Sequence, residues 1–174
     1  ADNPWVGQAD VQPELYSIGH RNVQGVLWDA ANQQLLAHEH GPRGGDELNL
    51  IEPGNNYGWP KITYGVDYSG AVISPYTEMD GLQQPLLQWT PSIAPSGMAL
   101  YQGEMFPQWQ GSLLVSTLAG HHVRRVSLDG LQVREQESLF SELGERIRDV
   151  RVAADGSIHL LTDSPQGRVL RISR

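Results

Sequence analysis

The chain has 174 residues, of which 39% are hydrophobic and 18% charged, and this composition excludes a disordered or fibrous protein. A formal net charge of -8, with basic residues scattered singly, argues against nucleic acid and anionic membranes as partners. There is no cysteine, which rules out disulfides and thiolate metal sites, and no apolar run reaches the roughly 20 residues that a membrane helix needs.

Three similar units follow one another along the chain, each with three short apolar strands. Apolar and polar residues alternate in the later strands, as in a sheet whose two faces are differently exposed. Nineteen glycines and eleven prolines indicate many tight turns between strands, so we expect an all-β fold. The expected strands lie at residues 25–28, 35–36 and 48–51, then 97–100, 112–115 and 123–126, then 149–152, 158–161 and 169–172.

Turns are expected where the strands end, at residues 29–32 and at the Asp-Gly pairs 129–130 and 155–156. Only residues 138–145 favour a short helical turn. Repeats of three or four antiparallel strands are typical of β-propeller blades, and periodicity alone leaves a β-sandwich open as the alternative.

Three blades cannot close a ring, because closed propellers have roughly four to eight. We therefore expect residues 1–174 to be about three blades of a larger propeller. Its open apolar faces would pair with a missing N-terminal half or with another copy of the chain. Ala1 and the loop-like segment 2–5 indicate that further sequence precedes this chain.

Two segments carry arginines at places where a propeller's inner strand opens onto its channel. Arg21 and Asn22 precede the first apolar strand, and a guanidinium group there suits a carboxylate. Arg146 and Arg148, two apart on an extended strand, project to one side as an anion clamp. The ordinary alternatives are an arginine bonded to local carbonyls and a solvated strand face with ion pairs to its neighbours, including Asp149.

Residues 39–47 and 53–60 are dense in glycine, proline and side-chain oxygens. Outward-turned carbonyls together with Asp and Glu are the ligands that calcium takes, although a polar loop with turn glycines has the same composition. His38 and His40 share a strand face but lack a third ligand, so zinc is not expected. No nucleophile elbow, phosphate-binding loop or dinucleotide fingerprint is present, which leaves an organic cofactor open.

Five motifs, in this order and spanning almost the whole chain, resemble the glucose/sorbosone dehydrogenase family, and most of all its branch of soluble aldose sugar dehydrogenases that use pyrroloquinoline quinone (PQQ). The resemblance implies the C-terminal half of a six-bladed propeller that oxidises aldose sugars to lactones with PQQ and calcium. It also implies a periplasmic or secreted location. The motifs are residues 19–22 (GHRN), 39–47 (EHGPRGGDE), 55–60 (NNYGWP), 91–97 (PSIAPSG) and 146–150 (RIRDV).

The resemblance also implies which residues bind the cofactor and the metal. The carbonyls of Gly41 and Pro42 would bind the calcium ion that touches PQQ, and Glu47 with the backbone oxygen of Tyr57 would bind a second, structural calcium. The residues implied in cofactor binding are Arg21, Asn22, His40, Trp89, Ser92, Arg146 and Arg148.

This chain departs from the family in two respects. Ala119 stands where the family usually offers the cofactor a lysine. The family's catalytic histidine comes from an earlier blade, so neither His20, His38 nor His40 takes that role and no catalytic residue is expected here. We therefore expect cofactor binding without turnover.

Two other functions compete with this one. A calcium-dependent propeller lactonase needs carboxylate-rich metal ligation, whereas the motifs here offer carbonyls and arginines. A non-catalytic binding module would explain the missing base. The dehydrogenase assignment predicts that Arg21, Gly41, Pro42 and Arg148 line one common cavity.

Overall fold

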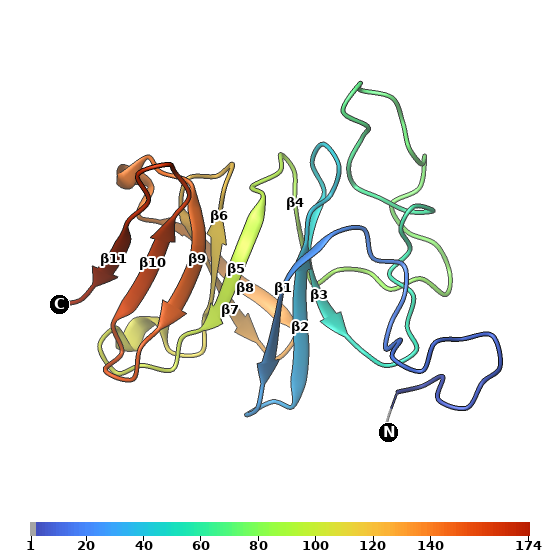
Figure 1. The fold of residues 1–174 in the computed structure, drawn as a ribbon, viewed down its shortest axis with the longest axis horizontal. Helices are drawn as coiled ribbons and strands as arrows, with labels where there is room; N and C mark the ends of the chain where they lie inside the picture. Colours follow the sequence, from blue (N-terminus) through green and yellow to red (C-terminus); the bar gives the residue numbers. More distant parts are fainter. Residues whose placement is uncertain (1–2) are drawn as a thin grey trace.

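The computed structural model describes residues 3–174, so Ala1 and Asp2 of the expected N-terminal loop lie outside the described residues. The described chain folds into three antiparallel sheets, one after another along the sequence (Figure 1). The first contains β1 (Val23–Asp29), β2 (Gln34–Glu39), β3 (Asp46–Ile51) and β4 (Leu87–Trp89). The second contains β5 (Pro95–Leu100), β6 (Leu113–Thr117), β7 (Val123–Asp129) and β8 (Gln132–Leu139), and the third β9 (Ile147–Val152), β10 (Ile158–Thr162) and β11 (Val169–Ile172).

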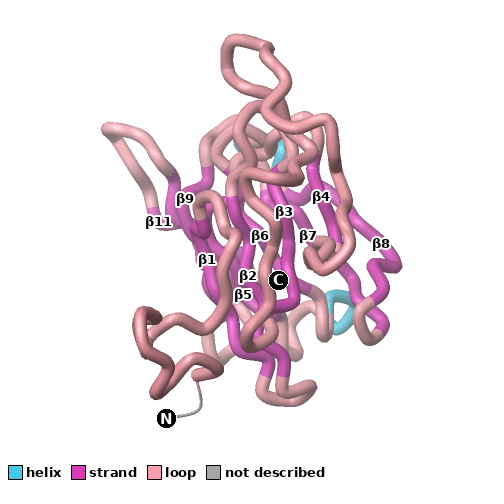
Figure 2. Tube along the Cα trace, turned by 90° about the vertical axis from the view of Figure 1, so that its right-hand side faces the viewer, coloured by secondary structure: helices cyan, strands magenta, loops and turns pink. Residues whose placement is uncertain are grey.

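The three predicted units are confirmed as three sheets whose strands pair in sequence order. Within residues 3–174, helix is limited to two short 3-10 turns (Figure 2), η1 (Pro107–Trp109) and η2 (Ser141–Leu143). The second lies in the segment expected to turn. The sequence patterns missed β4 and β8. In β8 no residue is buried, so the strand lacks the apolar alternation that identifies a half-buried strand. No helix in the described part of the chain is long and apolar enough to cross a membrane.

The first strand of each sheet is its inner strand, and β5 packs between β1 and β9. All three run downward in Figure 1, so their starts lie together at the upper end. Each of them also pairs irregularly near its start, at Val23–Gly25 in β1, at Pro95–Met98 in β5 and where β9 faces Thr162. Such bulges redirect side chains and are common beside functional sites.

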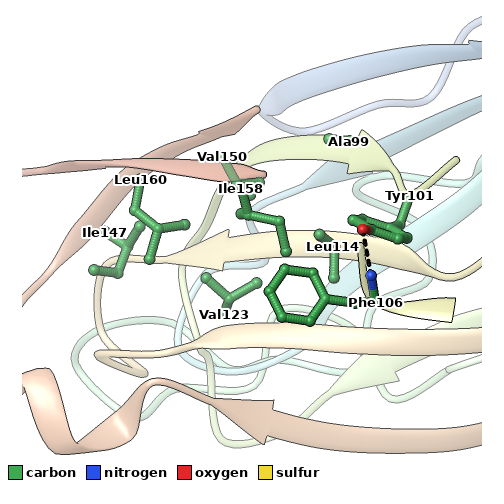
Figure 3. Close-up of a cluster of buried hydrophobic side chains, with 9 residues drawn as sticks. All are labelled: Ala99, Tyr101, Phe106, Leu114, Val123, Ile147, Val150, Ile158 and Leu160. Carbon is green, nitrogen blue, oxygen red and sulfur yellow. Dashed lines mark hydrogen bonds between the residues drawn. The ribbon is translucent and has the colours of Figure 1, made fainter. Parts of the chain in front are cut away.

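Two apolar clusters join the sheets. Leu36, Leu48 and Met98 belong to the cluster between the first and second sheets. The other, between the second and third sheets, is drawn in Figure 3 and includes the completely buried Tyr101, whose hydroxyl accepts from Phe106 N at 2.9 Å and donates to Gly156 O at 2.8 Å. Each fully buried aliphatic side chain stabilises the fold by about 1.5–3 kcal/mol, so these clusters fix how the sheets stand against one another.

A long segment, residues 52–86, connects β3 to β4 and covers the other face of the first sheet. Tyr57 from this segment packs against Ala37 and Ile51 of that face. Arg43 and Val66 exchange backbone hydrogen bonds of 2.9 and 3.2 Å. The segment is therefore fixed to the loop between β2 and β3, at the upper end of the molecule (Figure 1).

Candidate functional site

Arg21 lies just before β1 and points its guanidinium at main-chain oxygens. Its Nη1 donates to the carbonyl oxygens of Gly41 at 2.8 Å and His40 at 3.1 Å. Its Cζ lies 5.3 Å from the centre of the Trp59 ring, close enough for a cation–π contact. The Gly41 carbonyl oxygen thus already accepts a hydrogen bond from a guanidinium group, and a cation bound to this oxygen would displace that group.

The loop after β2 is held by Asp46, a completely buried carboxylate. One oxygen accepts from Gly41 N at 3.0 Å, and the other accepts from the hydroxyl of Ser92 at 2.6 Å and from the backbone N–H groups of Ile93 and Ala94 at 2.8 Å each. Four donors satisfy the charge without a cation. Asp46 therefore ties the loop at residues 40–45 to the loop that begins at Ser92.

Gly41 itself has no room for a side chain. A Cβ there would lie 2.2 Å from the carbonyl oxygen of Gly44 and 2.4 Å from that of Gly45. Because these neighbours are backbone atoms, they cannot rotate away. The close approach turns several main-chain oxygens of one short loop toward the same region, which suits a hard cation such as calcium.

A small polar pocket lies between Arg21 and the acidic side chains beneath it. It holds about 10 Å³, which is room for one water or one ion, and its walls include Glu39, Gly41, Glu47 and Tyr57. Burial raises the pKa of Glu47 to about 7, although the hydrogen bond from Asn49 acts in the opposite direction. A bound cation would favour the charged form of this carboxylate, so Glu47 is suited to act as a metal ligand.

A second, larger cavity of about 640 Å³ shares His40 and Gly41 with the first. Pro42, Ser92 and Tyr68 also line it, and Nε2 of His40 lies 2.7 Å from the carbonyl oxygen of Pro95. Its volume is in the range of small-molecule sites. The structure therefore brings Arg21, His40, Gly41, Pro42 and Ser92 into two adjoining pockets.

Arg146 and Arg148 lie elsewhere. Both guanidinium groups bind the carboxylate of Asp163, at 2.8 and 3.1 Å, so the two side chains do project to one side. Arg146 and Arg148 hold the pKa of Asp163 below its usual value. Asp149, the neighbour expected as a partner, instead pairs with Arg151.

The expectation of one common cavity is therefore not met. Arg148 lines a third pocket together with Gln24, Ser96 and Arg151, whereas Arg21, Gly41 and Pro42 line the first two. The physical reason is that Arg148 belongs to the third sheet and its guanidinium is drawn to Asp163, which follows β10. The two regions are still neighbours in the fold, because Ser96 donates to the carbonyl oxygen of Ile147 at 2.7 Å.

Trp89, which the resemblance implied in cofactor binding, does not line either of the first two pockets. Its side chain is buried in the apolar cluster between the first two sheets, and its Nε1 donates to Oε1 of Gln136 at 3.0 Å. Ala119 is exposed and its backbone N–H donates to Ile93 O at 3.1 Å, so it lies beside the loop that Asp46 holds. Asn22 is exposed, and its Oδ1 accepts from Gln24 at 2.9 Å.

Sequence reasoning missed three residues that build the site. Asp46 and Glu39 stood inside a recognised motif but without a role. Asn49 looked like an ordinary strand residue between Leu48 and Leu50. The sequence did offer one signal for Asn49: it lies two residues after Glu47, which puts both side chains on one face of a strand. Among residues 3–174 no group of three His, Asp or Glu side chains is placed to hold a metal, so an ion here needs main-chain oxygens.

Comparison with known proteins gives consistent results. The family model described as Glucose / Sorbosone dehydrogenase matches residues 1–171. Aldose sugar dehydrogenase YliI of Escherichia coli is 41% identical over 175 residues, covering 99% of this chain and 47% of that protein. A solved glucose dehydrogenase superposes with a TM-score of 0.96 at 47% identity, over 99% of this chain and 51% of the other.

The PQQ-bound form of an aldose sugar dehydrogenase from Streptomyces coelicolor superposes with a TM-score of 0.74 at 32% identity, over 99% of this chain and 47% of the other. These likenesses confirm the predicted propeller fold. The chain spans about half the length of the curated relatives it matches.

Proposed function

Because the chain belongs to the Glucose / Sorbosone dehydrogenase family, we propose that it supplies the cofactor clamp and calcium sites of a PQQ-dependent enzyme that oxidises aldose sugars to lactones. The observation that carries the proposal is the contact between the Arg21 guanidinium and the Gly41 carbonyl, at 2.8 Å. It puts an anion-binding group and a metal-binding oxygen at one point. PQQ, when bound with calcium, supplies the oxidising quinone and its Lewis acid.

The residues present fit both groups. The carbonyls of Gly41 and Pro42 suit a calcium ion beside the cofactor, and Glu47 with the backbone oxygen of Tyr57 suits a second one. The small pocket is the size of a single ion. Burial disfavours the charged form of the Glu47 carboxylate unless a cation compensates the charge. The remaining residues that would hold the cofactor are Arg21, Asn22, His40 and Ser92, together with Arg146 and Arg148 once these two arginines release Asp163.

The three histidines of the first sheet and the loops beside it, His20, His38 and His40, are not suited to remove the proton from the sugar hydroxyl. His20 is bonded on both ring nitrogens, to Ser17 at 2.8 Å and to Glu39 at 3.0 Å. His38 is completely buried, and Nε2 of His40 lies 2.7 Å from the Pro95 carbonyl oxygen. We therefore place the base outside residues 1–174, on a blade that this chain does not supply.

The test is a titration of the purified chain with PQQ, followed by cofactor absorbance and by quenching of tryptophan fluorescence, in calcium and in excess chelator. We expect calcium-dependent binding and no aldose-dependent reduction of a dye. Lack of binding at any calcium concentration would refute the proposal. Hydrolysis of a lactone would favour a propeller lactonase, and sugar binding without PQQ would favour a binding module.

A further inference from the structure

Asn49 connects the two carboxylates that line the small pocket. Its side chain is almost completely buried, with 1% exposed. Its Nδ2 donates to Oε1 of Glu39 and to Oε2 of Glu47, at 3.2 Å in each case. Its Oδ1 is buried and has no hydrogen-bond partner among the described residues, so the two carboxylates alone orient the amide.

Glu39 continues this connection toward the proposed cofactor site. It is 4% exposed, and its Oε2 accepts from the backbone N–H of Arg21 at 2.6 Å and from that of Asn22 at 3.3 Å. The side chain of Arg21 then reaches the carbonyl oxygen of Gly41. An unbroken series of hydrogen bonds thus leads from Glu47 through Asn49 and Glu39 to the first residues before β1.

The balance of charges makes this series sensitive to a cation. Two carboxylates share one neutral donor in a largely buried place, where repulsion between like charges is poorly screened. Glu39 also contacts Nδ1 of His20 at 3.0 Å, whereas Asn49 is the side-chain hydrogen-bond partner of Glu47 among the described residues. A cation on Glu47 offsets that repulsion, so Glu39 can hold Asn49 and both backbone N–H groups in good geometry. Without the cation, the two carboxylates repel each other, and the amide of Asn49 lies between them as a donor to both.

We propose that Asn49 is a positioning residue through which cation binding at Glu47 strengthens cofactor binding by Arg21 and Asn22. The inference rests on the proposed function, because it assumes that PQQ is the ligand of those two residues. Linkage requires the converse as well: cofactor binding strengthens cation binding at Glu47 by the same factor.

A cycle of two substitutions tests the coupling. PQQ dissociation constants are measured in calcium for the wild-type chain, Asn49→Leu, Glu47→Gln and the double variant. Each single change should weaken PQQ binding about 5- to 20-fold, and the double variant no further, because both changes break one path. Losses that multiply in the double variant, or an Asn49→Leu affinity equal to wild type, would overturn the proposal.

The matched control is Asn32→Leu, the same chemical change in the turn between β1 and β2. Asn32 donates to Asp29 at 2.8 Å and lies at the opposite end of these strands, so PQQ affinity should not change. An equal loss of affinity in this variant would show that the Asn49 effect is not specific.

Hydrogen exchange gives a readout that needs calcium alone. Calcium should slow exchange of the Arg21 and Asn22 amides in the wild type and leave it unchanged in Asn49→Leu. A purely structural role predicts faster exchange over the whole sheet with the calcium response retained, and that result would contradict the proposal.

If Asn49→Leu does not fold, Asn49→Ser replaces it. If the wild type does not bind PQQ, the proposed function fails, and the exchange experiment still decides the role of Asn49.

Discussion

At the scale of single residues, the buried polar side chains of the first sheet include two that hold the site, Asp46 and Glu39, and one without a hydrogen-bond partner among the described residues, His38. Asp46 and Glu39 each accept several hydrogen bonds and thereby fix the two loops that meet at Gly41. His38, by contrast, is completely buried in β2 with neither ring nitrogen bonded within residues 3–174. Its ring lies under Gly25, where a Cβ would be 2.4 Å from Nε2.

His38 predicts how stability depends on pH. Burial, and secondarily the nearby His40, lowers its pKa from 6.5 to about 4. Between pH 6.5 and about 4, His38 binds a proton in the unfolded chain but not in the folded chain. The free energy of unfolding therefore falls as the pH falls through this range. Relative to His38→Leu, the wild type should lose about 2 kcal/mol of unfolding free energy between pH 7.5 and pH 5.

Urea unfolding at the two pH values measures this loss, and the difference between proteins removes the contribution of other titrating groups. His159→Leu, which removes a partly buried histidine on β10, is the control for the loss of an imidazole elsewhere in the chain. An equal pH dependence in wild type and His38→Leu would show that His38 does not cause it.

At the scale of elements, the three inner strands bring their starts to one end of the molecule, and the loops there carry the candidate site. Arg146 and Arg148 at the start of β9 are occupied by Asp163, from the loop after β10. All three side chains are substantially exposed, so these ion pairs contribute little to stability. Their effect is instead to compete with any anionic ligand for the same guanidinium groups.

Asp163→Asn should therefore strengthen PQQ binding several-fold while changing the free energy of unfolding by less than about 1 kcal/mol. The change removes the competing charge but leaves both arginines in place. Titration and urea unfolding measure the two quantities. Asp129→Asn, which breaks a similar exposed pair between the last residue of β7 and Arg134 on β8, should leave PQQ affinity unchanged. Weaker PQQ binding in Asp163→Asn would mean that Arg146 and Arg148 do not hold the cofactor.

The sequence predicted the strands well where one face is buried, as in β9 and β10, because burial imposes an apolar alternation that can be read locally. It missed β8, whose residues face solvent or half-buried surroundings. It also could not predict that Asp163 holds Arg148 or that Asn49 joins Glu39, because these pairs are 15 and 10 residues apart and depend on how the strands are paired.

At the scale of the whole molecule, the described chain is a set of three blades whose outer sheets expose apolar residues. Val26 and Trp28 on β1 are 60% and 57% exposed, and Val169 on β11 is 71% exposed. Neighbouring blades would cover such surfaces. We propose that the rest of a longer protein, or a second copy of this chain, completes the ring.

We propose that Arg21 and the Gly41 carbonyl form one binding point for an anionic cofactor and its cation. A crystal structure of the chain grown with PQQ and calcium tests it most directly. We predict calcium on the carbonyl oxygens of Gly41 and Pro42, and a PQQ carboxylate on Arg21, whose guanidinium has left the Gly41 carbonyl. Cofactor density in another pocket, with Arg21 still bonded to Gly41, would contradict the account.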